Sequence, residues 1–247
     1  MVTSASVLVR DLLVGPVRRA SVVATGPMAT YLDVDGRFLA VVAAGGVRLP
    51  CAVMLGPGVR PPVGPDVVVG DDHIVAASWF DPRVRVGPVE PCAVERLAAE
   101  LRSRPGGDPL LPADAADRLA TALGGDELDA VVAGLVGRGS GLTPAGDDLL
   151  AGALAALRAL GSGAAADHLA AAVRTSAPGR TTRLSVALLE AAAVGAIIPE
   201  AESVLRALAR PTPPDGLDGL VGVGHTSGWH LAAGIVVGAA HAVGVFA

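Results

Sequence analysis

The sequence predicts an α+β protein, with a small N-terminal β-barrel or sandwich-like domain at residues 1–90 and an all-helical domain at residues 91–247. Two observations predict this order. Short valine-rich runs separated by Gly-Pro pairs fill residues 20–90, which is typical of proteins built from several short strands. From Cys92 onward, apolar residues recur every three to four positions, as in amphipathic helices. The change of pattern at residues 88–92 therefore marks the expected boundary.

The clearest β element is a hairpin within residues 30–42. Two alternating runs flank Asp35-Gly36, a dipeptide that tolerates the positive φ angles of a type I′ turn. Further strands are expected at four valine-rich runs, which are Val47–Leu55, Val67–Val69, His73–Ala77 and Arg83–Val86.

Helical periodicity predicts eight helices after the boundary. They are expected at 92–103, 113–123, 126–136, 143–160, 164–174, 182–196, 199–209 and 226–244, with a proline-rich loop at 210–214. The last apolar stretch is nearly long enough to span a membrane, but it contains His230 and His241. Because ionisable groups are costly in lipid, a buried core helix is the favoured interpretation.

Composition excludes several classes of chemistry. The chain has no lysine, asparagine or glutamine, so all 19 cationic side chains are arginines. Schiff-base enzymes, phosphate loops of the GxxxxGK[ST] type and the kinase catalytic set all need residues that are absent here. A net charge of −5, without a basic block or an aromatic platform, argues against nucleic-acid binding. Two cysteines without a CxxC pair, and an N-terminus without a signal-peptide core, predict a cytoplasmic protein.

A glycine-rich loop precedes the predicted helix 143–160. Thr143 is expected to be its N-cap and Pro144 its first residue. Gly139 and Gly141 allow the backbone to turn and to approach a ligand closely, with Ser140 between them. Free N–H groups and the helix dipole then favour an anion at this point.

Two acidic residues, Asp147 and Asp148, lie one turn into the same helix. One interpretation is a capped helix whose acids complement the dipole. The combination of glycines, serine, cap and acid pair favours a functional site instead, because an Asp pair in an apolar helix needs partners. These carboxylates are candidates to orient substrate or a divalent cation.

A second helix start crowds cationic and hydroxyl side chains together. Arg180, Thr181, Thr182, Arg183 and Ser185 follow one another closely, and arginine suits bidentate contact with carboxylate or phosphate. Thr181 or Thr182 is expected to cap the helix. A purely structural cap with solvated arginines explains the pattern equally well.

A third helix start carries the sequence Gly-His-Thr-Ser-Gly. Thr226 or Ser227 is expected to cap the final helix, and His225 precedes the cap, where it could donate to an anion or act as an acid or base. A structural histidine in a glycine-rich turn is the alternative. No histidine spacing resembles a zinc site, and neither Ser140 nor Ser227 lies in a GxSxG motif.

The three motifs together resemble the family of the AllH-type subunit of bacterial oxamate carbamoyltransferase, long listed as a domain of unknown function. The matching stretches are Gly137–Gly152, Thr181–Ser185 and Gly224–Gly228. The resemblance implies carbamoyl transfer carried out together with partner subunits. One departure is His230, which stands where an acidic residue often follows the third motif.

We therefore predict a small-anion-binding protein, expected to be a subunit of a carbamoyltransferase-type enzyme. The residues expected to bind the anionic substrate are Gly139, Ser140, Gly141, Thr143, Arg180, Thr181, Thr182, Ser185, Thr226 and Ser227. The residues expected to be catalytic are His225, Asp147 and Asp148. Protein partners are expected, and neither nucleic acid nor membrane. Two alternatives stay open: a non-catalytic assembly or ligand-sensing subunit, and a metal hydrolase in which Asp147 and Asp148 bind Mg²⁺.

Overall fold

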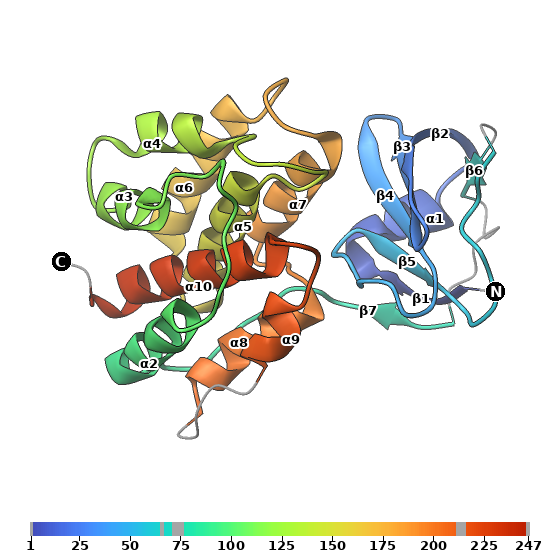
Figure 1. Cartoon of the computed structure of the whole chain (residues 1–247). Helices are drawn as coiled ribbons and strands as arrows, with labels where there is room; N and C mark the ends of the chain where they lie inside the picture. The colour runs from blue at the N-terminus through green and yellow to red at the C-terminus, as the bar shows by residue number, and fades with distance from the viewer. Residues whose placement is uncertain (1, 65–66, 71–76, 211–215, 246–247) are drawn as a thin grey trace. The chain divides into compact units, whose positions relative to one another are not determined.

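The computed structural model describes residues 2–64, 67–70, 77–210 and 216–245 (Figure 1). Contacts between residues divide the chain into two compact units, 1–82 and 83–247. Each unit has its own secondary structure and its own core.

Seven strands of the N-terminal unit form one mixed sheet in the order β6-β2-β3-β4-β5-β1-β7. Their bounds are β1 (Val2–Ser6), β2 (Arg18–Thr25), β3 (Ala29–Val34), β4 (Arg37–Val42), β5 (Ala52–Leu55), β6 (Val67–Val69) and β7 (Trp79–Phe80). Neighbouring strands are antiparallel except for the parallel pairs β4–β5 and β1–β7. The expected β-rich region is thus confirmed, although its described strands form one curled sheet with edges at β6 and β7, and not a closed barrel or a sandwich.

The predicted hairpin is confirmed as β3–β4. Val34 pairs with Arg37, and the two turn residues have positive φ angles, 52° at Asp35 and 84° at Gly36. Both signs fit a type I′ turn, whose twist matches that of the flanking strands.

Other strand predictions had mixed outcomes. Residues 47–55 contribute β5, 67–69 form β6, and the run at 73–77 falls largely outside the described residues. The prediction at Arg83–Val86 was wrong, because Arg83 makes an isolated bridge to Ala196 within the helical unit. A short 3-10 turn (Val7–Val9) and α1 (Arg10–Val14) were not predicted; Leu12 and Leu13 on α1 are buried in the core beneath the sheet.

The second unit is built from helices. Their bounds are α2 (Pro91–Arg102), α3 (Ala115–Ala122), α4 (Leu128–Leu135), α5 (Ala145–Ala159), α6 (Gly163–Ser176), α7 (Arg183–Ala193), α8 (Pro199–Leu208), α9 (Leu217–Val221) and α10 (Ser227–Val243). All eight predicted helices are present within a few residues of their expected ends. The short α9 was missed, and the predicted loop at 210–214 lies almost entirely outside the described residues.

The centre of this unit is the pair α5 and α10, which cross closely (Figure 1). All but one residue of α5 are buried. A Cβ on Gly234 would lie 2.1 Å from the carbonyl oxygen of Leu149, and one on Gly152 would lie 2.2 Å from that of Leu231. Small residues therefore let the two backbones touch. In the described part of the chain, no helix combines the length and the apolar character needed to cross a membrane.

Candidate functional site

The starts of α7 and α10 both meet the loop before α5. The Thr182 hydroxyl donates to the carbonyl oxygen of Leu142 at 2.6 Å. The hydroxyls of Thr143 and Ser227 lie 2.8 Å apart and share a hydrogen bond. The three motifs, although far apart in sequence, therefore converge at the first turn of α5.

Glycines shape the loop that precedes α5. Gly137 has a φ of 71°, and a Cβ there would lie 2.1 Å from the carbonyl oxygen of Arg180. Gly139 has a φ of 119° and lies against the backbone nitrogen of Ala145. Gly141 also has a positive φ, but an added Cβ there would meet open space. The loop is packed at its beginning and open at its tip.

The expected cap of α5 was wrong by one residue. The helix begins at Ala145, and Pro144 occupies the N-cap position without a side-chain hydrogen bond. The N–H groups of Asp147 and Asp148 both donate to the Pro144 carbonyl oxygen. The Gly146 N–H donates to the Arg138 carbonyl oxygen, so these first-turn N–H groups are already paired within the backbone, and the Thr143 hydroxyl pairs with Ser227.

Asp147 is a buried carboxylate that joins two of the motifs. Its side chain accepts hydrogen bonds from the Gly137 N–H at 2.9 Å and from the Thr181 hydroxyl. Burial raises the pKa of Asp147 above its ordinary value, while hydrogen bonds from Thr181, Gly137 and Ser185 act in the opposite direction. Asp147 is 2% exposed, so it fastens the start of α7 to α5 from within the protein.

Of the two carboxyl groups, Asp148 has the more strongly raised pKa. It is 5% exposed, and its Oδ2 atom has no hydrogen-bond partner among the described residues. Burial raises the pKa of Asp148 well above its ordinary value, against the effect of the Ser227 hydroxyl, and the charge of Asp147 raises it further. This carboxyl therefore keeps its proton to a higher pH than an exposed aspartate.

The second motif caps its helix as predicted. Thr182 is the N-cap of α7, and its hydroxyl accepts a hydrogen bond from the Ser185 N–H at 3.0 Å. The Ser185 hydroxyl faces the Leu142 carbonyl oxygen at 3.5 Å. Arg180 is exposed, and its guanidinium donates to the carbonyl oxygen of Ala133 on α4.

Only part of the third motif contacts the start of α5. Thr226 is the N-cap residue of α10, as predicted, but its side chain makes no capping hydrogen bond. His225 is exposed, and no described residue provides a polar partner for its ring. Of this motif, the Ser227 hydroxyl is the group that contacts the α5 loop.

Two polar residues beside the converging helix starts, Asp108 and His230, were not predicted as site residues from the sequence. The Asp108 carboxylate accepts hydrogen bonds from the Ser140 N–H and hydroxyl, both at 3.1 Å, and from the Leu110 N–H at 2.8 Å. These backbone hydrogen bonds lower the pKa of Asp108. Asp108 lies in a Gly-Gly-Asp-Pro segment that resembles an ordinary turn, so no local pattern indicates its pairing with Ser140.

His230, noted in the sequence as a departure from the family pattern, is 1% exposed and fully paired. Its Nε2 accepts from the Asp108 N–H at 3.3 Å, so its Nδ1 carries the proton and donates to the Thr226 carbonyl oxygen at 2.9 Å. Burial lowers the pKa of His230, which keeps the ring neutral near pH 7. The residue joins the start of α10 to the segment between α2 and α3.

No group of three or more His, Cys, Asp or Glu side chains that could hold a metal ion occurs in the described ranges of the chain.

Comparison with known proteins finds a match to part of the chain. Residues 135–239 match the family model described as oxamate carbamoyltransferase subunit AllH. The match covers less than half of the chain, and over that segment the chain is similar to the AllH family. The matched segment begins at the end of α4, ends within α10 and contains all three motifs together with His230, whereas Asp108 lies outside it. No curated protein and no solved structure matched the chain.

Proposed function

We propose that the chain is a subunit of a carbamoyltransferase-type enzyme and that the starts of α5, α7 and α10 form its binding site for a small anion. The observation that carries the proposal is the convergence of the three AllH motifs on the buried pair Asp147 and Asp148. Hydroxyls and a carboxylate that meet from three separate helices indicate a shared role.

The groups at this point suit a carbamoyl compound. Such a compound combines an amide group, which donates and accepts hydrogen bonds, with an anionic group. The N–H groups of Gly146, Asp147 and Asp148 at the start of α5 donate to backbone carbonyls, so the anion would be met by the dipole of α5 and by the open backbone at Gly141. Arg180 and His225 stand exposed at neighbouring helix starts. Asp147 and Asp148 would orient the amide, and His225 remains the acid or base candidate.

A specific observation favours a second candidate, a non-catalytic assembly subunit. The hydroxyls of Thr143, Thr181 and Thr182 already have protein partners. Groups that are satisfied within the protein hold three helices in register without any ligand. In this alternative the anion is bound by a partner subunit.

Calorimetry of the isolated chain separates the two candidates. Phosphate, carbamoyl phosphate and oxamate would each be titrated, with and without Mg²⁺. A binding role predicts heat with at least one of them, and weakening by about tenfold or more in the Asp147→Asn/Asp148→Asn double variant, because a hydrogen bond to a charged group contributes about 1.5–3 kcal/mol. The exposed Asp129→Asn is the matched control.

The assembly role predicts no heat from the isolated chain and association with a partner subunit that depends on the same residues. Unchanged anion binding by a folded double variant would remove the two aspartates from the binding site. Circular dichroism of each variant establishes that it is folded.

A further inference from the structure

A cavity of about 620 Å³ lies beside the helix starts, away from Asp147 and Asp148. Its walls come from the segment between α2 and α3, from the start of α3, and from Leu149 on α5 and Ala233 on α10. Its volume falls within the range of small-molecule sites. The role proposed above for the AllH motifs makes no use of this cavity.

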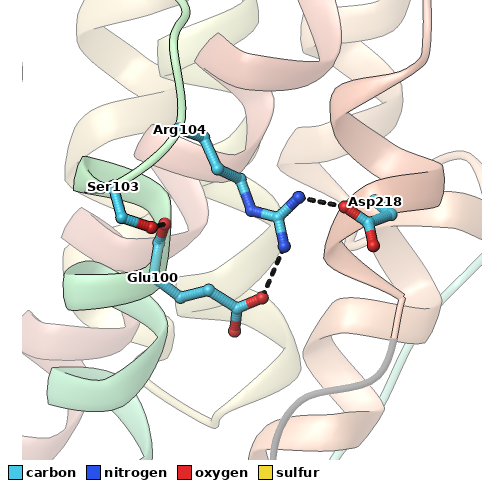
Figure 2. Close-up of polar contacts among 4 residues, drawn as sticks. All are labelled: Glu100, Ser103, Arg104 and Asp218. Atoms are coloured by element: carbon cyan, nitrogen blue, oxygen red, sulfur yellow. Dashed lines mark hydrogen bonds and ion pairs between the residues drawn. The ribbon is translucent and has the colours of Figure 1, made fainter.

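The wall formed by residues 103–114 is fixed at two points. Arg104 pairs with Glu100 at 2.7 Å and with Asp218 on α9, and Figure 2 shows its guanidinium between the two carboxylates. Asp108 pairs with His230 and Ser140. A wall held at both points is preformed, which reduces the entropy lost when a ligand binds.

The charged side chain that lines the described part of the cavity is negative. Among the described residues that line it, Asp108 is ionised and no arginine is present. The His230 ring is neutral, since its Nε2 accepts a hydrogen bond from the Asp108 N–H. The Asp108 carboxylate accepts three hydrogen bonds, whereas a carboxylate has about four acceptor sites. An unpaired anion is therefore disfavoured here, and a cation with N–H groups is favoured.

Trp229 gives the cavity a flat aromatic wall. Its indole ring lies at an edge-on angle of 74° to the His230 ring, with the ring centroids 5.2 Å apart. Its Nε1 is buried without a partner in the described structure, covered by Gly106, where an added Cβ would lie 2.4 Å from that atom. The face of an indole is the best aromatic platform for a cation.

We propose that this cavity binds a small, flat cation of the amidinium or guanidinium class. The N–H groups of the cation donate to the Asp108 carboxylate, and its plane lies against Trp229. Apolar residues such as Pro109, Leu111 and Leu149 enclose the rest of the molecule. This site adjoins the proposed anion site, because Asp108 accepts hydrogen bonds from Ser140, and it accepts the opposite charge.

Tryptophan fluorescence tests the proposal. The chain has two tryptophans, so Trp79→Phe leaves Trp229 as the sole tryptophan, and excitation beyond the tyrosine absorption band isolates its emission. Benzamidine, benzamide and benzoate have one shape and differ in charge. The expected result is a saturable change in emission with benzamidine, a weaker one with benzamide and none with benzoate. Equal or tighter binding of benzoate, or no saturable change with any of the three, would overturn the proposal.

Matched variants in the same background locate the binding. Ala116→Leu fills the cavity from α3 and should weaken benzamidine binding at least tenfold, whereas Ala120→Leu, one turn further along and outside the lining, should leave it unchanged. Asp108→Asn should also weaken it at least tenfold. If Asp108→Asn fails to fold by circular dichroism, the alanine pair still decides the matter. Equal affinities in the two leucine variants would contradict binding in this cavity.

Discussion

Asp148 places a carboxyl oxygen in the protein interior without a described partner, so its protonation state should influence stability. The folded-state pKa is raised above the unfolded value of about 3.9. Between those two values the folded chain holds a proton that the unfolded chain has released. The free energy of unfolding should therefore fall as pH rises through this window, and Asp147 acts in the same direction.

Asp148→Asn removes the ionisable group and keeps the shape. We expect the variant to lose part of this pH dependence, with a higher free energy of unfolding than the native chain above the window. Urea unfolding followed by Trp229 emission in the Trp79→Phe background, at a series of pH values from about 4 upward, measures it. Exposed Asp129→Asn should keep the native slope. A native slope in Asp148→Asn would assign the effect to another group.

The hydrogen bond from Thr181 to Asp147 should contribute measurably to stability, since its acceptor is buried. Thr181→Val preserves the branched shape and removes the hydroxyl. We expect a loss of about 1–3 kcal/mol, because the carboxylate keeps its burial and loses a donor. Thr175→Val, which removes an exposed hydroxyl bonded to the Ala171 carbonyl oxygen, should change stability by about 0.5 kcal/mol or less. Equal losses in the two variants from urea denaturation would contradict a special role for Thr181.

At the scale of residues, the sequence could predict local pairings but not distant ones. Thr182 was identified as a cap candidate because a cap and its N–H target are three residues apart. The partner of Thr143 is 84 residues away, and that of Ser140 is 32 residues away. Hydroxyls in a glycine-rich loop look the same whether they face a ligand or another helix, and only tertiary structure decides between them.

At the scale of elements, the crossing of α5 and α10 depends on glycine. Gly234→Ala would place its Cβ 2.1 Å from the Leu149 carbonyl oxygen and 2.8 Å from the Ala153 nitrogen, so the helices must move apart. Overpacking of this kind costs about 1–3 kcal/mol. Gly134→Ala on α4 meets nothing within 4 Å and should be neutral or stabilising by up to about 1 kcal/mol. Chemical denaturation compares the pair, and a tolerated Gly234→Ala would show that the crossing is loose.

Helices were easier to predict than the sheet for a physical reason. Helical hydrogen bonds and the apolar repeat lie within a few residues, so periodicity indicates α2 to α8 and α10. The hairpin β3–β4 is equally local, since its turn residues carry the signal. The parallel pairing of β4 with β5 and of β1 with β7 joins segments whose order no sequence period records. For the same reason a barrel, a sandwich and one curled sheet were not distinguished.

At the scale of the whole molecule, composition and site agree. A chain without lysine, asparagine or glutamine relies on arginine, hydroxyls, carboxylates and backbone groups for polar contacts. In the helical unit these groups collect where helices begin, and alanine and glycine fill the spaces between helices. Biased composition is thus compatible with a specific polar cluster, because the cluster is built from the residue types that remain.

The extent of the helical unit leads to the last prediction. Contacts divide the chain between Pro82 and Arg83, before the composition change at 88–92. The segment between these two points, residues 83–88, is hydrogen-bonded to the second unit. The Val84 N–H donates to the Gly195 carbonyl oxygen, and the Val86 N–H donates to the Ala159 carbonyl oxygen. Val84 is also buried, at 3% exposure. We therefore expect a fragment of residues 83–247 to fold by itself, with Trp229 reporting one cooperative urea transition.

A fragment of residues 91–247 keeps every helix of the unit but loses these ties. Two backbone hydrogen bonds contribute about 1 kcal/mol each, and burial of one valine contributes about 1.5–3 kcal/mol. The shorter fragment should therefore be less stable than the longer one by about 3.5–5 kcal/mol. Fragments of equal stability would place the boundary at the composition change, and the absence of a cooperative transition in 83–247 would show that the helical unit needs the sheet in order to fold.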